Sequence, residues 1–213
     1  MMLHGYLSCK ESFSYQTDFF SRYFTVVVPD MAGFNGVPMA YPYALDDYAC
    51  DLKNLLRPVV GRINVIAHSF GARVLFKFLP DERVDKIVLT GAAGIRPRRS
   101  LKRAVKVFRY KFRKRLGLDV SDFGSSDFKA LDTLMKKSFV KIVNERLENR
   151  IRAVDKKTLI VVGDADKETP PYMAKRMNKL IAGSALVTIS GAGHFAFVDA
   201  PYRFNTIVKE FLL

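Results

Sequence analysis

A serine at the end of an apolar run is the residue of this chain best placed to do chemistry. Ile63, Val65 and Ile66 form an apolar, β-branched run, and residues 72–79 suit a helix, so we expect Ser69 at a sharp turn between strand and helix. Such a turn exposes a serine at a sheet edge as a nucleophile. Ala67 and Gly71 flank it, since the elbow needs small residues, although Ala67 departs mildly from G-x-S-x-G. The alternative interpretation is that Ser69 is a helix N-cap.

A serine nucleophile needs a base, and the chain offers three histidines. His194 lies in a glycine-rich loop directly after the apolar run 185–189, which places it at the end of a predicted strand. A base is needed at that edge of the sheet, although a surface loop histidine is the alternative interpretation. His68 adjoins Ser69, so we expect its side chain to point elsewhere on the turn.

A third group must orient the base, and two aspartates could do so. Asp164 and Asp166 both follow the predicted strand 158–163. The chain order is then serine, aspartate and histidine, each at the end of a predicted strand.

These motifs, in this order, resemble the α/β-hydrolase superfamily over nearly the whole chain. The resemblance implies a catalytic triad of Ser69, Asp166 and His194. It also favours Asp166 over Asp164, because the family's acid follows a G-x-x-D pattern, which residues 163–166 match.

Two further segments carry the resemblance. Residues 3–6 match the family's H-G-x segment, so the backbone N–H groups of Tyr6 and Phe70 are implied to form the oxyanion hole. Residues 28–34 resemble the family's D-x-x-G-F turn, but Asn35 stands where a glycine is common.

The expected fold class is α/β, with a mostly parallel central sheet and helices on both faces. The alternation of apolar runs and helical patterns predicts strands near 24–28, 62–67, 84–90, 158–163 and 185–189, and helices near 11–22, 44–56, 70–79, 170–181 and 201–212. The resemblance implies that residues 1–95 and 158–213 form the hydrolase core. It also implies that residues 96–157 form a helical cap, which is inserted before the last two strands.

The resemblance also implies that the family's N-terminal strands are lacking. Only residues 1–3 remain of the strand before the H-G-x turn, and the fold places that strand between 24–28 and 62–67. Such a short strand leaves backbone groups of its neighbours without partners. Three explanations stay open: a start further upstream, a poorly stable hydrolase, or a sheet that closes differently. The last two would displace Tyr6.

The positive charge of the chain is concentrated in the expected cap. Residues 96–157 carry a net charge of +13, against +14 for the whole chain. Within residues 96–118, which hold 11 basic and no acidic side chains, apolar residues recur at helical spacing: Leu101, Val105, Phe108, Phe112 and Leu116. This pattern predicts an amphipathic helix. Its apolar face could simply pack over the active site, or the helix could attract an anionic membrane surface or substrate. No nucleic-acid motif appears, so we expect no nucleic-acid partner.

Composition narrows the remaining choices. The two cysteines form no disulfide framework, which favours a reduced, cytoplasmic compartment, and the scattered histidines and cysteines form no metal pattern. We see no signal peptide or membrane-spanning segment, and no cofactor is implied. We therefore expect a serine hydrolase whose small-molecule substrate is a carboxylic ester with an apolar acyl group; amide, thioester and carbon–carbon substrates stay open. The alternative is a non-catalytic, ligand- or partner-binding member of the resembled fold. With either function, the basic cap could bind an anionic membrane.

Overall fold

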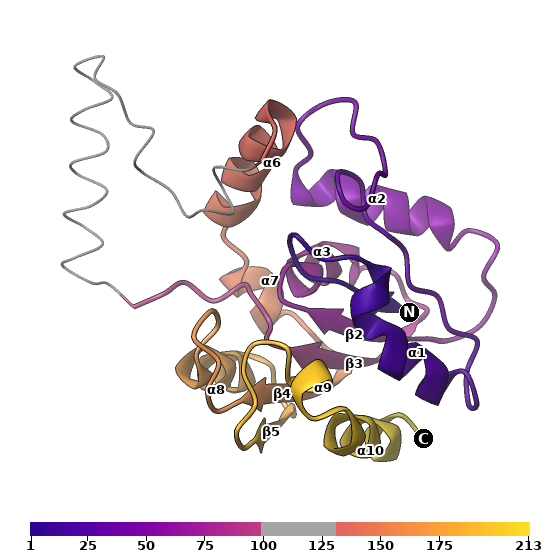
Figure 1. Ribbon diagram of the computed structural model, residues 1–213, viewed down its shortest axis with the longest axis vertical. Helices are drawn as coiled ribbons and strands as arrows, with labels where there is room; N and C mark the ends of the chain where they lie inside the picture. The colour runs from indigo at the N-terminus through magenta and orange to yellow at the C-terminus, as the bar shows by residue number, and fades with distance from the viewer. Residues whose placement is uncertain (99–130) are drawn as a thin grey trace.

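Five parallel strands form a single sheet in the computed structural model, which describes residues 1–98 and 131–213 (Figure 1). The strands lie in chain order: β1 (Met2–Leu3), β2 (Ile63–His68), β3 (Val84–Thr90), β4 (Lys157–Gly163) and β5 (Ala185–Ile189). Every pairing between neighbours is parallel, so the carboxyl ends of all five strands meet at one edge. The predicted parallel α/β architecture is confirmed.

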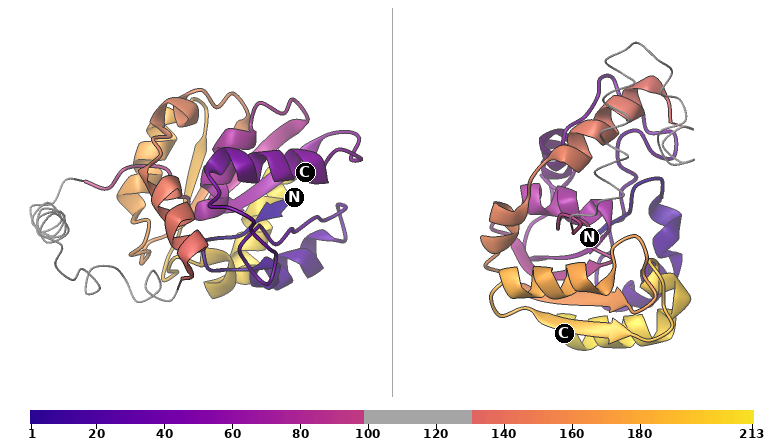
Figure 2. Two further views of the ribbon diagram at one scale, coloured as in Figure 1. Left: turned by 90° about the horizontal axis from the view of Figure 1, so that it is seen from above. Right: turned by 90° about the vertical axis from the view of Figure 1, so that its left-hand side faces the viewer.

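Helices cover both faces of this sheet because its strands are apolar on both sides. Val65 and Leu89 point into one hydrophobic cluster, and their neighbours Ile66 and Val88 point into the other. The first cluster is covered by α2 (Leu45–Leu55), α3 (Phe70–Phe78), α6 (Thr133–Asn144), α7 (Glu148–Arg152) and α8 (Pro171–Leu180). The second is covered by the 3-10 helix η1 (Lys10–Phe13), α1 (Ser14–Phe20), α9 (Ala196–Asp199) and α10 (Pro201–Leu212). Figure 2 shows α8 and α10 on opposite sides of the sheet.

One predicted strand is wrong. Residues 24–28 form no strand, and a single backbone hydrogen bond joins them to β1, from Met2 N to Val27 O at 2.9 Å. The physical reason is the length of β1: two residues, which pair with Ile66 and Ala67 of β2, cannot also support a ladder on their other side.

The expected cap is described only in part. Residues 99–130 lie outside the described residues, and with them most of the predicted amphipathic helix, so both interpretations of that helix stay predictions. The described part, α6 and α7, is tied to the core by the Arg73 guanidinium, which donates to the carbonyls of Ile142 at 2.5 Å and Glu145 at 2.8 Å. The Ser138 hydroxyl adds a bond to the Tyr43 carbonyl at 2.8 Å. Within residues 1–98 and 131–213, no helix is long and apolar enough to cross a bilayer.

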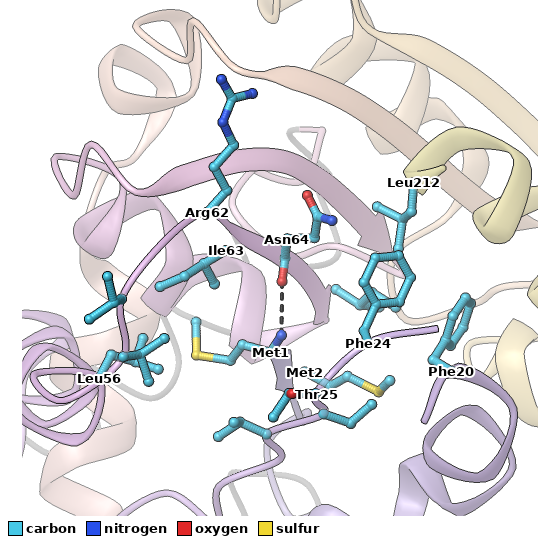
Figure 3. A pocket seen from close by; sticks show the side chains of 15 residues that line it. Met1, Met2, Phe20, Phe24, Thr25, Leu56, Arg62, Ile63, Asn64 and Leu212 are labelled. Atoms are coloured by element: carbon cyan, nitrogen blue, oxygen red, sulfur yellow. Dashed lines mark hydrogen bonds between the residues drawn. The ribbon is translucent and has the colours of Figure 1, made fainter. Parts of the chain in front are cut away.

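The start of β1 opens onto a cavity of about 380 Å³ (Figure 3). Its walls are largely apolar and include Phe24 and Leu212. The Met1 ammonium group is buried beside it and donates to the Asn64 carbonyl at 2.8 Å. Because burial disfavours the charged form, the pKa of this amine falls to about 6 from its ordinary value of 8.0.

The buried amine predicts that stability falls when the pH is lowered from 8 to 6. In this range the unfolded chain takes up a proton that the folded chain does not, so the free energy of unfolding decreases, by about 2–3 kcal/mol in total. Urea titrations at several pH values check this on protein whose free Met1 amine has been verified by mass. An N-acetylated sample should lose this part of the pH dependence; equal dependence in both samples would contradict the assignment.

Candidate active site

Ser69 occupies a strained turn between β2 and α3. Its backbone has φ 47° and ψ −109°, a left-handed conformation that costs a non-glycine residue about 1–3 kcal/mol. The surrounding structure holds it there: Ser69 N donates to the Thr90 carbonyl at 3.1 Å, and Ser69 O accepts from Ala93 N at 3.1 Å. The Ser69 side chain makes no capping hydrogen bond to α3, so its hydroxyl is not used as an N-cap.

Small residues around this elbow are required by close backbone approach. A Cβ on Gly71 would overlap the Leu3 carbonyl, so any larger residue there would push β1 away. Ala67 is fully buried and pairs with Leu3 on one side and Leu89 on the other.

His194 is hydrogen-bonded to Asp166. The two side chains meet at 2.9 Å between His194 Nδ1 and Asp166 Oδ2. Because an ionised carboxylate only accepts, Nδ1 carries a proton, and an imidazole with its single proton on Nδ1 has a lone pair on Nε2, on the opposite side of the ring. This is the state in which an imidazole can act as a general base.

Asp166 is itself held in place and kept ionised. It accepts the backbone N–H groups of Glu168 at 2.8 Å and Thr169 at 2.9 Å, and the Thr169 hydroxyl donates to Oδ2 at 2.8 Å. Burial pushes its pKa upward, but the bonds from His194 and Thr169 outweigh this and leave the pKa below its ordinary value. The carboxylate therefore stays an acceptor at neutral pH.

Asp164 lies elsewhere. Its carboxylate accepts from Gly191 N at 2.8 Å and from the Ser190 hydroxyl at 3.1 Å, so it orders the turn after β5. Of the two aspartates left open by the sequence, only Asp166 is hydrogen-bonded to His194.

Ser69 and His194 both lie against the end of β3. Ser69 is bonded to Thr90, and the next residue, Gly91, lies so close to His194 that an added Cβ would be 2.9 Å from the His194 carbonyl oxygen and 3.0 Å from Nδ1. No hydrogen bond joins the Ser69 hydroxyl to His194 in the described structure. In enzymes without substrate such bonds are often long and tighten on binding.

The turn that contains Tyr6 follows the short β1 and is held by hydrogen bonds of a buried histidine. His4 is buried and fixes the turn, with Nδ1 donating to Gly5 O at 2.8 Å and Nε2 accepting from Met31 N at 3.0 Å. The Tyr6 ring lies edge-on to the Phe70 ring, with centroids 5.5 Å apart. Tyr6 N–H has no acceptor among the described residues, and Phe70 N–H belongs to the first turn of α3, where no intrahelical acceptor exists.

Asn35 directly follows residues 28–34, which resemble a D-x-x-G-F turn in sequence, and it fits the backbone there. Its φ is 47°, and asparagine tolerates this left-handed conformation better than other non-glycine residues. Its side chain also donates to Asp30 at 3.0 Å. The departure from glycine is therefore accommodated.

Aromatic rings form the apolar surroundings of the Tyr6 turn. The Tyr6 ring lies 5.0 Å from the rings of both Phe34 and Phe139, and Phe34 lies 5.7 Å from Phe70. Phe139 comes from α6, so the segment between β3 and β4 contributes to these surroundings.

Sequence reasoning missed two residues of the site. Thr169 joins Asp166 through its hydroxyl, at the short spacing typical of local side-chain turns. His68 was expected to point elsewhere, but its ring lies 4.7 Å from the His194 ring. Strand periodicity could have found it, because His68 shares a face with Ile66, two residues earlier, and Ile66 packs in the cluster under α9 and α10.

Comparison with known proteins agrees with the resemblance seen in the sequence. A family model described as "Alpha/beta hydrolase family" matches residues 1–207. A curated protein of Pseudomonas putida strain F1, named 2-hydroxy-6-oxo-2,4-heptadienoate hydrolase, is 24% identical over 229 residues, covering 90% of this chain and 79% of its own length.

Solved structures share the fold. An esterase from Exiguobacterium antarcticum superposes with a TM-score of 0.78 at 21% identity, covering 100% of this chain and 91% of its own. A meta-cleavage product hydrolase from Pseudomonas fluorescens IP01 superposes with a TM-score of 0.75 at 20% identity, covering 99% of this chain and 89% of its own.

The contact between Gly91 and His194 predicts a site-specific cost for an added methyl group. Gly91→Ala should lose about 1 kcal/mol from its positive φ of 51° and about 1–3 kcal/mol more from overpacking against His194. Gly183→Ala is the control, because Gly183 has a φ of 69° with nothing near its Cβ position and should show only the first loss. Denaturant unfolding measures both; equal losses would show that the contact is unimportant.

Proposed function

The chain belongs to the alpha/beta hydrolase family, and from that premise we propose that it is a serine hydrolase that cleaves carboxylic esters through an acyl-enzyme. The observation that carries the proposal is the hydrogen bond from His194 to Asp166 beside the strained turn at Ser69. A nucleophile, a base and the group that orients the base thus come from three strand ends at one edge of the sheet.

In the first half of the proposed reaction, His194 Nε2 takes the proton of the Ser69 hydroxyl while Oγ attacks the ester carbonyl carbon. The free N–H groups of Tyr6 and Phe70 stabilise the negative oxygen of the tetrahedral intermediate. The intermediate then collapses: the bond to the alkoxy group breaks, His194 returns the proton to the departing alcohol, and Ser69 carries the acyl group.

In the second half, water replaces the alcohol. His194 takes a proton from water, whose oxygen attacks the acyl carbon, and Oγ leaves and regains its proton from His194. Asp166 stabilises the imidazolium that forms in both halves without taking its proton, consistent with its lowered pKa. The nucleophile, the base, the orienting acid and both oxyanion donors are groups of this chain.

The substrate is proposed to carry an apolar acyl group. The support is the ring group of Tyr6, Phe34, Phe70 and Phe139 beside the proposed oxyanion donors. Phe195, next to the proposed base, is 39% exposed and adds apolar surface that a substrate can cover.

A second candidate reaction is hydrolysis of a carbon–carbon bond in a small keto acid. The observation in its favour is the pair of relatives named above, a 2-hydroxy-6-oxo-2,4-heptadienoate hydrolase and a meta-cleavage product hydrolase. Incubation of the protein with short- and long-chain esters and, separately, with 2-hydroxy-6-oxo-2,4-heptadienoate distinguishes the two by which substrate is turned over.

The proposed nucleophile predicts a single reactive serine. Ser69 Oγ should attack the phosphorus of a fluorophosphonate and displace fluoride, which gives one covalent adduct seen by intact-protein mass spectrometry. Ser69→Ala should form no adduct, keep its circular dichroism spectrum and lose at least about 10³-fold in kcat on the best substrate. Turnover retained by this variant would overturn the mechanism. A folded protein that forms no adduct would instead support the non-catalytic, ligand- or partner-binding alternative.

The two aspartates provide a matched test of the orienting acid. Asp166→Asn should lower kcat by about 10³–10⁴-fold, because the amide cannot stabilise the imidazolium. Asp164→Asn keeps the shape of the turn after β5 and should stay within about 3-fold of the parent, since its partners are Ser190 and Gly191. Steady-state kinetics on purified variants measure both effects. A larger loss in Asp164→Asn would assign the acid to the other position.

A further inference from the structure

His68 is a buried titratable group that the proposed reaction does not use. It is the last residue of β2, directly before Ser69, and it has no solvent exposure. Its ring lies 4.7 Å from the His194 ring at an interplanar angle of 53°, and 4.7 Å and 5.0 Å from the rings of Phe195 and Phe197. His68 therefore packs against three aromatic side chains of the segment that carries the proposed base.

The ring of His68 is held in one orientation. Nδ1 lies 3.1 Å from the Thr90 carbonyl, which can only accept, so Nδ1 carries the proton. Nε2 has no hydrogen-bond partner in the described structure, and a Cβ on Gly5 would lie 3.2 Å from it. Burial lowers the pKa of His68 to about 3, so the ring is neutral over the whole range in which hydrolysis would be measured.

The Thr90 carbonyl links this ring to the nucleophile. It accepts the Nδ1–H of His68 and also the backbone N–H of Ser69, each at 3.1 Å. The same atom therefore anchors the strained turn and the ring against which His194 packs. A displacement of the His68 ring would therefore act on the His194 ring directly, with Asp166 left in place.

We propose that His68 is a positioning residue: its ring, anchored on Thr90, supports the His194 imidazole so that Nδ1 stays on Asp166 and Nε2 stays directed away from it, toward the nucleophile. This inference rests on the proposed function. A buried histidine with one unpartnered nitrogen carries a desolvation cost that a purely apolar ring would avoid. What the ring supplies to His194 is a flat surface, which a non-aromatic side chain cannot supply.

Two substitutions separate the ring from its hydrogen bond. His68→Phe keeps an aromatic ring and removes both nitrogens, and the Thr90 carbonyl retains the Ser69 N–H as a donor. His68→Asn keeps a donor for Thr90 and removes the ring. We expect His68→Asn to lower kcat by about 10–100-fold with little change in KM, because loss of orientation affects the chemical step. His68→Phe should recover most of that rate.

A second readout follows His194 independently of catalysis. In water, the Nδ1–H proton of His194 should give a downfield NMR resonance, assigned by its loss in Asp166→Asn. It should persist in His68→Phe and weaken or disappear in His68→Asn. His68→Gln serves as the ring-free variant if the asparagine variant does not fold, as judged by circular dichroism.

The outcomes are distinct. Equal losses of kcat in the phenylalanine and asparagine variants, or a His194 resonance that neither changes, would overturn the positioning role. Absence of a fluorophosphonate adduct on the parent protein would overturn the proposed function instead, while the NMR comparison would still report whether His68 holds His194.

Discussion

The carbonyl of Thr90 is the atom on which the geometry of the candidate site depends. It lies at the carboxyl end of β3, the central strand, and it accepts one hydrogen bond from the Ser69 backbone and one from the His68 ring. The following residue, Gly91, makes room for His194. An ordinary backbone bond therefore helps to hold Ser69 in its left-handed conformation, and the sheet brings the ends of β2 and β3 and the loops after β4 and β5 together at one edge.

Much of this arrangement could be predicted from residue patterns. The strands at 84–90 and 185–189 and the helix at 201–212 have the predicted bounds, because continuous apolar runs and an unbroken amphipathic period leave few alternatives. The placement of Asp166 near His194 stayed an expectation until the structure gave their distance, since spacing alone cannot exclude Asp164. Local patterns also cannot report how a strand is completed by its neighbours, which is why the strand predicted at 24–28 was wrong.

His68 illustrates a different limit. Because His68 adjoins Ser69 in the chain, the sequence predicts only that its side chain points elsewhere on the turn, and it does not say which neighbours the ring meets. In the structure, the side chain of His68, the last residue of β2, lies on the face of the sheet that α9 covers. Its ring packs near the rings of His194 and Phe197. Period-two alternation along β2, and not proximity to Ser69 in the chain, determines which face of the sheet His68 occupies. In our proposal that position gives His68 its role.

The order of the strands has a consequence for how the folding protein would acquire the reactivity proposed for Ser69. Tyr6, Ser69, Asp166 and His194 span most of the chain, and each parallel pairing requires a long crossover before its hydrogen bonds can form. No short fragment of the chain holds all four of these residues, so a partly folded chain lacks the complete arrangement. Reactivity toward an acylating or phosphonylating reagent would therefore report completion of the sheet, and its appearance during refolding would lag behind the formation of helices.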